Sequence, residues 1–355
     1  MTNPSSLTAQ APSPICRDTA WTRTVPELKP LLHGPVQIET PIVQAALSGY
    51  SDWPMRVVAR RLGAPYTIAE VMIDRFVLDL KNRKATQKHL RVTDAEHPAG
   101  GQLMGSNPAH FPPAAQRLVE AGFDVIDINF GCPVKSAVGG CRGGYHLGQP
   151  EIALEIVARV RNAVPDTVPV TVKMRRGIDD SSESEDRFFE IFDGIFEHGA
   201  AAVTVHGRTV QQKYNGPSSW DFLRRVKCHA GSRTVIGSGD IFTPQASLDM
   251  LSYTGVDGVS VARGAIGNPW FFQQTHRLAR GASVTLPSVR EQRRVLAMQL
   301  ELCREIYDDR GSAAVMRKFG IKFAPLHPAH KDVRNAFARG KSLTDWQNVL
   351  DRFYV

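Results

Sequence analysis

The chain has 355 residues, of which 42% are hydrophobic and 22% charged, a composition typical of folded globular proteins and not of disordered or fibrous ones. No apolar run approaches the roughly 20 residues that a membrane-spanning helix needs, and the first 15 residues lack the basic start and apolar stretch of a secretory signal. The length suits either one barrel of about 250 residues with an appendage or two ordinary domains.

The five cysteines indicate the cellular location, and the net charge indicates the kind of partner. Five is an odd number, and no two cysteines are spaced as a Cys-x-x-Cys pair, so we expect no disulfide framework, no metal site and a location in the reducing cytoplasm. The formal net charge is +8, and residues 311–355 hold eight Lys or Arg against three Asp. A cationic segment at one end indicates either a polyanionic partner or a solvated helical surface.

Strands and helices are predicted to alternate along most of the chain. Residues 1–35, rich in Ser, Thr and Pro, are predicted to be a loosely ordered extension. Apolar, β-branched runs then predict strands at 41–47, 66–71, 99–105, 123–130, 168–175, 201–207, 233–239 and 258–264. Helical patterns separate them, among them 113–122, 151–164, 187–199 and 244–255, and several close on Gly as helix C-termini often do.

This alternation predicts an α/β fold with a parallel sheet. Eight strand–helix units in about 230 residues favour a closed TIM (β/α)8 barrel over an open doubly wound sheet, and we assign the barrel to residues 36–285. Beyond about residue 288 the pattern is helical, at 290–309, 313–327 and 342–354. Residues 286–355 are therefore predicted to form a C-terminal helical domain.

Chemically useful side chains recur where the predicted strands end. Such barrels carry their functional groups at the C-terminal ends of the strands. Taken alone, each group has an ordinary explanation as a satisfied core residue, but chance explains the whole set poorly. In chain order these groups are Gln102, Asn129 with Cys132, Lys173 with Arg175, His206 with Arg208, the stretch 237–240, and Arg263 with Gly264.

The last two strand ends suit a phosphate. Loops after strands seven and eight of such barrels commonly bind phosphate through main-chain N–H groups, and here they contain 237–239 and 262–264, with Arg263 adding charge. No G-x-G-x-x-G follows a first strand, which excludes a Rossmann site. A phosphate there, with Lys173 and His206 nearby, suits flavin mononucleotide, because a lysine near N1 and O2 stabilises the anionic reduced ring.

Cys132 lies between a predicted strand and a glycine-rich loop. The stretch 127–144 reads DINFGCPVKSAVGGCRGG. An isolated cysteine in this position is most simply a small buried hydrophobe. The alternative is a reactive thiol, with the glycines of 139–144 permitting the loop to move as a lid.

The ordered set of motifs resembles the tRNA-dihydrouridine synthases, flavin enzymes that reduce the C5=C6 bond of selected tRNA uridines. The similarity runs from about residue 38 to near the C-terminus. The motifs that carry it are Q-L-M-G (102–105), D-I-N-F-G-C-P (127–133), V-K-M-R (172–175), V-H-G-R-T (205–209), Y-N-G-P-S-S-W (214–220), G-S-G-D-I (237–241) and A-R-G-A (262–265).

The resemblance implies FMN as cofactor, NADPH or NADH as reductant and tRNA as substrate, with no metal and a monomeric state. It implies that Cys132 is the catalytic proton donor to uracil C5 while reduced flavin delivers hydride to C6; a thiol is mostly protonated at neutral pH yet able to release its proton. The uridine must leave its stack to reach the flavin. The FMN contacts implied are Gln102, Asn129, Lys173, His206, Ser238, Gly239, Asp240, Ala262, Arg263 and Gly264.

The resemblance also implies residues that contact uracil or RNA. These are Lys135, Arg175, Arg208 and Tyr145 near the barrel mouth, and Arg317, Lys318 and Lys322 in the helical domain. For Lys135 and Arg208 a solvated surface is an equal alternative. The basic stretch 81–91 is either a phosphate track or, as we slightly favour, a solvated loop. Tyr145 either stacks on a base or, as we favour, packs within the lid. The neighbouring His146 is an alternative acid, but we favour Cys132 as the proton donor.

The chain departs from the family pattern at several positions. The first strand ends Ala45-Ala46-Leu47 where Ala-Pro-Met is usual, Ser238 replaces Asn, and Ala262 replaces Gly. Two alternatives stay open: a flavin barrel acting on a small molecule, like a dihydroorotate dehydrogenase, and a tRNA-binding protein without catalysis. The sequence does not identify the tRNA position or the preferred nicotinamide.

Overall fold

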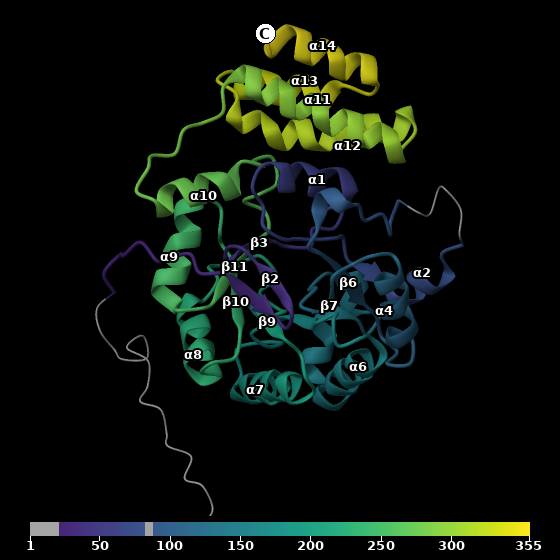
Figure 1. The fold of residues 1–355 in the computed structure, drawn as a ribbon, viewed down its shortest axis with the longest axis vertical. Coiled ribbons are helices and arrows are strands. Elements are labelled where there is room, and N and C mark those ends of the chain that lie inside the picture. The colour runs from purple at the N-terminus through teal and green to yellow at the C-terminus, as the bar shows by residue number, and fades with distance from the viewer. Residues whose placement is uncertain (1–20, 82–87) are drawn as a thin grey trace, which may run out of the picture.

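A closed parallel barrel forms the centre of the computed structural model, which describes residues 21–81 and 88–355. Its strands are hydrogen-bonded in the order β4-β3-β11-β10-β9-β8-β7-β6-β5, and β4 also pairs with β6, which closes the sheet (Figure 1). The strands are β3 (Ile42–Gln44), β4 (Thr67–Ile68), β5 (Met72–Ile73), β6 (Ala99–Met104), β7 (Val125–Phe130), β8 (Val170–Arg175), β9 (Ala202–His206), β10 (Val235–Ser238) and β11 (Gly258–Val261).

The TIM-barrel prediction is confirmed. Each of the eight predicted ranges contains one strand, and among the barrel strands only the two-residue β5 was not predicted. Helices surround the barrel, and the four predicted patterns coincide with α4, α6, α7 and α9. The outer helices are α1 (Trp53–Arg61), α2 (Asp74–Asp79), α4 (Phe111–Glu120), α6 (Pro150–Ala163), α7 (Ser182–Glu197), α8 (Trp220–Ala230), α9 (Pro244–Thr254) and α10 (Phe271–Ala279).

The main core lies between the barrel strands and these helices. Ile128, Val172 and Val205 on the strands, and Leu118 and Phe188 on the helices, are fully buried. Parallel strands with both faces covered contain near-continuous apolar residues. These apolar runs allowed the strands to be predicted from the sequence.

A small antiparallel hairpin closes the N-terminal end of the barrel. It consists of β1 (Leu31–His33) and β2 (Val36–Ile38). Leu31 and Ile38 are buried in one cluster with Val125 and other residues near the starts of barrel strands. The expectation of a loosely ordered extension up to residue 35 is therefore wrong for β1, and the barrel is left open at the opposite end.

The C-terminal helices form a separate layer that rests on α1 (Figure 1). They are α11 (Val289–Ile306), α12 (Asp309–Phe323), α13 (His330–Arg339) and α14 (Leu343–Phe353). Their core includes Met316 and Phe337 and continues into Trp53 and Met55 of α1. Helix α1 thus has one face in the helical layer and another, at Ala59, in the barrel core.

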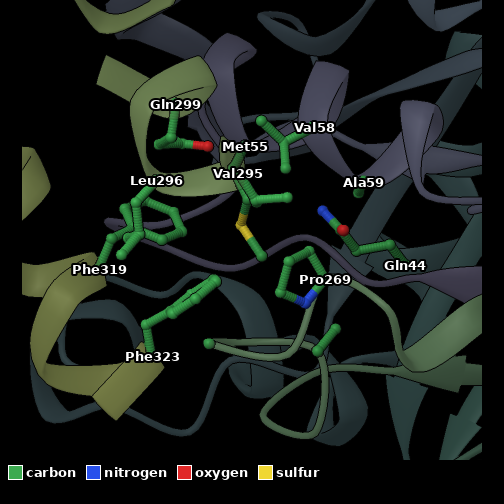
Figure 2. Close-up of a pocket in the computed structure, with 12 residues that line it drawn as sticks. Gln44, Met55, Val58, Ala59, Pro269, Val295, Leu296, Gln299, Phe319 and Phe323 are labelled. Carbon is green, nitrogen blue, oxygen red and sulfur yellow. The ribbon is translucent and has the colours of Figure 1, made fainter. Parts of the chain in front are cut away.

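The junction between the two cores is almost completely filled. A cavity of about 20 Å³ lies between Met55 of α1, Leu296 of α11 and Phe323 of α12. The amides of Gln44 and Gln299 project toward it (Figure 2). That volume holds about one water molecule. We therefore attribute it to packing at the junction and not to a ligand.

The described residues contain no helix long and apolar enough to cross a membrane and no cluster of three side chains that could hold a metal ion. Among them Cys132, Cys141 and Cys303 carry free thiols.

A buried ion pair fastens α1 to the segment that precedes β6. Arg56 Nε donates to Glu96 Oε2 at 2.7 Å, and the two side chains are 2% and 0% exposed. The Arg56 guanidinium also donates to the main-chain oxygens of Ser51 and Arg91. Removing one partner of such a pair leaves an uncompensated buried charge.

We expect Glu96→Ala to lower the free energy of unfolding by about 3–5 kcal/mol, measured by urea unfolding at equal cofactor content. Glu155→Ala is the control, because Glu155 forms an exposed i,i+4 pair with Arg159 and should cost less than about 1 kcal/mol. Equal effects of the two substitutions would contradict the role given to the buried pair.

Candidate active site at the open end of the barrel

The sequence-predicted residues surround one cavity of about 360 Å³ at the C-terminal ends of the strands, within the size range of small-molecule sites. Ala45, Ala46 and Leu47, where the chain departs from the family pattern, also line it. The predicted residues brought together here are Gln102, Asn129, Cys132, Lys173, Arg175, His206, Ser238, Gly239, Asp240, Ala262 and Arg263.

A buried carboxylate orients two amides beneath this cavity. Asp127 on β7 is 1% exposed and accepts hydrogen bonds of 2.6 Å from Gln102 Nε2 and from Thr171 Oγ1. Burial raises its pKa, and these two hydrogen bonds oppose the rise. Because both carboxylate oxygens of Asp127 act as acceptors, Gln102 must direct its NH2 group toward Asp127. The Gln102 side-chain oxygen then faces Asn129.

The same chain of hydrogen bonds positions Cys132. Gln102 Oε1 accepts from Asn129 Nδ2 at 2.8 Å. Asn129 Oδ1 in turn accepts from the main-chain N–H groups of Gly131 and Cys132, both at 3.0 Å. The amides keep one further N–H hydrogen each, and the Cys132 thiol is free and partly exposed to the cavity.

Two glycines of the following loop pack directly against Cys132. Gly144 N–H donates to the Cys132 carbonyl at 3.0 Å. Gly143 has φ +60°, and a Cβ there would lie 2.8 Å from the Cβ of Cys132. Both glycines are buried. For these two positions, close packing replaces the lid mobility that we expected from the sequence.

Lys173 presents an unpaired ammonium group to the cavity. No acceptor among the described residues lies within hydrogen-bonding distance of its Nζ. Burial lowers its pKa to about 8, and the charge of Asp127 partly offsets this. Lys173 therefore remains mostly charged at neutral pH. Because a buried charged donor without a partner is costly, the cavity suits a ligand that supplies the acceptor.

His206 at the end of β9 is a neutral donor. Burial, together with the charges of Lys173 and Arg175, lowers its pKa to about 2. Arg208 N–H donates to Nδ1 at 3.1 Å, so the ring proton must reside on Nε2. This proton is free to bond a ligand in the cavity.

Main-chain N–H groups without an acceptor among the described residues occur at the ends of β10 and β11. In the described part of the chain, the main-chain N–H groups of Gly239, Arg263 and Gly264 have no acceptor. Side chains are excluded there, since a Cβ on Gly239 would overlap Ser218 Oγ and one on Gly264 would overlap the Ile241 carbonyl. Unpaired main-chain N–H groups can bind phosphate. Gly239 and Arg263 line the cavity, whereas Gly264 does not.

Arg208 corrects one of the RNA assignments. It is 3% exposed and does not line the cavity. Its guanidinium donates to both carboxylate oxygens of Asp240 at 2.8 Å and to the Gly216 carbonyl at 3.0 Å. The expectation that Arg208 contacts RNA is wrong, because its donors hold two loops together. Asp240, expected at the cofactor, is correspondingly neutralised and also accepts from Ser218 N–H.

Arg175 lines the cavity but its guanidinium is also engaged. It donates to the carbonyls of Gly131, Thr209 and Lys213 at 2.9, 2.7 and 2.7 Å. These contacts fix the loop after β9 against the Cys132 loop. An RNA contact by Arg175 would therefore use its Nη2 group, which takes no part in these three hydrogen bonds.

Three predicted or considered residues farther along the Cys132 loop, Lys135, Tyr145 and His146, lie outside the cavity lining. His146 is 1% exposed and bonds the Gly105 carbonyl through Nε2 at 2.9 Å, so it does not compete with Cys132 as an acid. Tyr145 is half-buried with its ring edge against His146, which agrees with packing. Lys135 is exposed on the short helix α5 (Lys135–Val138).

The predicted RNA contacts of the tail lie on the exposed surface of α12. Arg317, Lys318 and Lys322 are all exposed. Lys318 reaches the cavity rim, where its Nζ donates to the Gly49 carbonyl at 2.6 Å and lies 5.4 Å from the ring of Tyr50, which lines the cavity. Of the basic stretch 81–91, residues 82–87 lie outside the described residues.

Two aromatic residues at the rim were not predicted. Tyr214 and Phe242 line the cavity yet are 55% and 52% exposed. Tyr214 opens the motif Y-N-G-P-S-S-W (214–220). The alternation of strands and helices in the sequence, however, does not reveal that an aromatic side chain in a loop faces solvent.

Comparison with known proteins agrees with this geometry. The family model described as dihydrouridine synthase (Dus) matches residues 43–354. A probable tRNA-dihydrouridine synthase of Rickettsia conorii is 33% identical over 80% of this chain and 84% of its own length. The tRNA-dihydrouridine synthase B of Pseudomonas putida is 31% identical over 88% and 90%.

Solved structures show the same fold at low identity. Histamine dehydrogenase from Rhizobium has a TM-score of 0.56 and 15% identity, over 78% of this chain and 50% of that one. Morphinone reductase has a TM-score of 0.52 and 14% identity, over 72% and 91%. The matched family model extends over both the barrel and the C-terminal helices, and the chain belongs to the dihydrouridine synthase family.

Proposed function

We propose that the protein is a tRNA-dihydrouridine synthase that reduces the C5=C6 bond of tRNA uridines, with FMN as cofactor and NADPH or NADH as electron source. The observation that carries the proposal is the unpaired Lys173 ammonium in the same cavity as the free Cys132 thiol. Family membership and the names of the relatives support it.

The residues present fit FMN. The unpaired N–H groups at Gly239, Arg263 and Gly264 would hold its phosphate. Lys173 would offset negative charge on the reduced ring system, and the Nε2–H of His206 would donate a further hydrogen bond. When bound, FMN supplies the hydride for uracil C6.

Cys132 would complete the reduction by moving its thiol proton to uracil C5. Its Sγ is accessible from the cavity, while its main chain is fixed by Asn129 on one side and Gly144 on the other. Such fixation favours proton transfer, because a general acid acts only when it lies within hydrogen-bonding reach of the reacting atom. The thiolate then regains its proton from solvent.

The direct test is Cys132→Ala. We expect dihydrouridine formation in tRNA to fall by about 10²- to 10⁴-fold, measured by mass spectrometry of tRNA nucleosides, while FMN content and FMN reduction by NADPH stay unchanged. Cys141→Ala is the matched control, because Cys141 is a free, exposed thiol of the same loop outside the cavity.

Full tRNA reduction by the Cys132 variant would exclude the acid assignment. Turnover of orotate without RNA would instead indicate a small-molecule reductase. A colourless purified protein that does not take up FMN would indicate a tRNA-binding protein without catalysis.

Lys173 gives the reaction an alkaline limit. Its pKa of about 8 means that its charge is present below pH 8 and lost above it. We expect the rate of FMN reduction by NADPH to fall as the pH rises through about 8, since a neutral amine no longer offsets charge on the reduced ring. This half-reaction is measured by stopped-flow absorbance and does not involve the Cys132 proton.

The charge-retaining variant Lys173→Arg controls for this assignment. Because a guanidinium remains charged beyond pH 12, its alkaline limb should be absent up to pH 10, whatever its absolute rate. An unchanged limb in Lys173→Arg would show that another group titrates.

Arg317, Lys318 and Lys322 give a prediction for tRNA affinity. If they contact phosphates, log Kd should rise steeply with log salt concentration between about 50 and 200 mM, and Lys322→Ala should reduce the slope by about one unit. The measurement is fluorescence anisotropy with labelled tRNA. Binding that does not change with salt would count against this surface.

A further inference from the structure

Three planar groups lie close together on the rim of the cavity. The Arg263 guanidinium carbon lies 5.3 Å from the ring centre of Tyr214 and 4.7 Å from that of Phe242. Tyr214 and Phe242 are 55% and 52% exposed, and the Arg263 side chain is 45% exposed. Exposed apolar residues that group together next to a cavity mark interaction sites, unlike those scattered singly over a surface.

The loops that present these groups are held in place. Tyr214 lies between Lys213 and Gly216, whose carbonyls accept from Arg175 and Arg208. The Arg208–Asp240 pair then joins this loop, which follows β9, to the loop after β10 that carries Phe242. The three planar groups are thus positioned before any ligand arrives.

The chemistry of this stack fits an unpaired nucleobase. RNA-binding proteins hold splayed bases on aromatic rings and on arginine planes, a contact that tolerates any base. A uridine that leaves its stack also deprives its neighbour of a stacking partner, and the backbone brings that neighbour to the rim of the cavity the uridine enters. The arginine in the stack adds attraction to the phosphates.

We infer that Tyr214, Arg263 and Phe242 form a stacking platform for the nucleotide next to the target uridine. The inference rests on the proposed function and adds a site to it. It assigns the Arg263 side chain to RNA and leaves its main-chain N–H for the cofactor phosphate. It also replaces Tyr145, which we considered from the sequence, as the aromatic residue that meets RNA.

The test is Phe242→Ala in the FMN-loaded full-length enzyme. From the strength of base–aromatic stacking, we expect kcat/KM for tRNA to fall about 5- to 150-fold, with a matching loss of affinity for labelled tRNA by anisotropy. FMN content and the rate of FMN reduction by NADPH should not change. Phe242→Trp, with a larger ring, should equal or exceed the wild type, a result that misfolding cannot produce.

The matched control is Phe76→Ala, which removes another exposed phenylalanine, on α2 and outside the cavity, and should leave tRNA affinity unchanged. A tRNA with an abasic nucleotide beside the mapped dihydrouridine has no base to stack on the platform. The wild type and Phe242→Ala should therefore bind this tRNA with equal affinity. Wild-type tRNA affinity in Phe242→Ala would overturn the inference, as would a defect confined to FMN reduction, which would identify the stack as a nicotinamide site.

These outcomes are separable from the proposed function. A wild type that forms no dihydrouridine refutes the activity, whereas the tRNA affinities still decide whether the platform binds RNA.

Discussion

The site depends on one buried carboxylate that can only accept hydrogen bonds. Asp127 fixes the amide of Gln102, which fixes Asn129, which in turn holds the main chain at Cys132. Neutral amides alone would leave two equally good orientations at each step. The negative charge of Asp127 also raises the pKa of Lys173 and so favours its charged form. The same carboxylate therefore contributes both to the position of the Cys132 thiol and to the protonation of Lys173.

The arginines around the cavity act mainly on the protein itself. Arg175 and Arg208 donate to six acceptor groups in the loops that follow β7, β9 and β10. Loop carbonyls lack the regular partners of a helix or strand, and guanidinium groups with five donors each satisfy several at once. Their charges also keep His206 neutral. Arg175 and Arg208 therefore both hold the loops in place and set the electrostatic potential of the cavity.

The helical layer is joined to the barrel by packing and by a few polar contacts. Helix α1 shares its apolar residues between the two cores. At the cavity rim, Lys318 of α12 bonds the loop after β3, and Tyr307 donates to Asp52, the residue that caps α1. An exposed basic helix is thereby held next to the open end of the barrel, where a macromolecular substrate that enters the cavity would also meet it.

The sequence by itself determined the barrel, its eight strands, the helical tail and most of the cavity lining, including Cys132, Lys173 and His206. These were legible because parallel strands are continuous apolar runs and because functional groups of such barrels follow strand ends. Only the tertiary structure decided the roles of Arg208, His146 and Gly143, the hairpin at β1, and the exposure of Tyr214 and Phe242. Those features depend on which side chains meet across loops distant in the chain, and local patterns carry no information about such contacts.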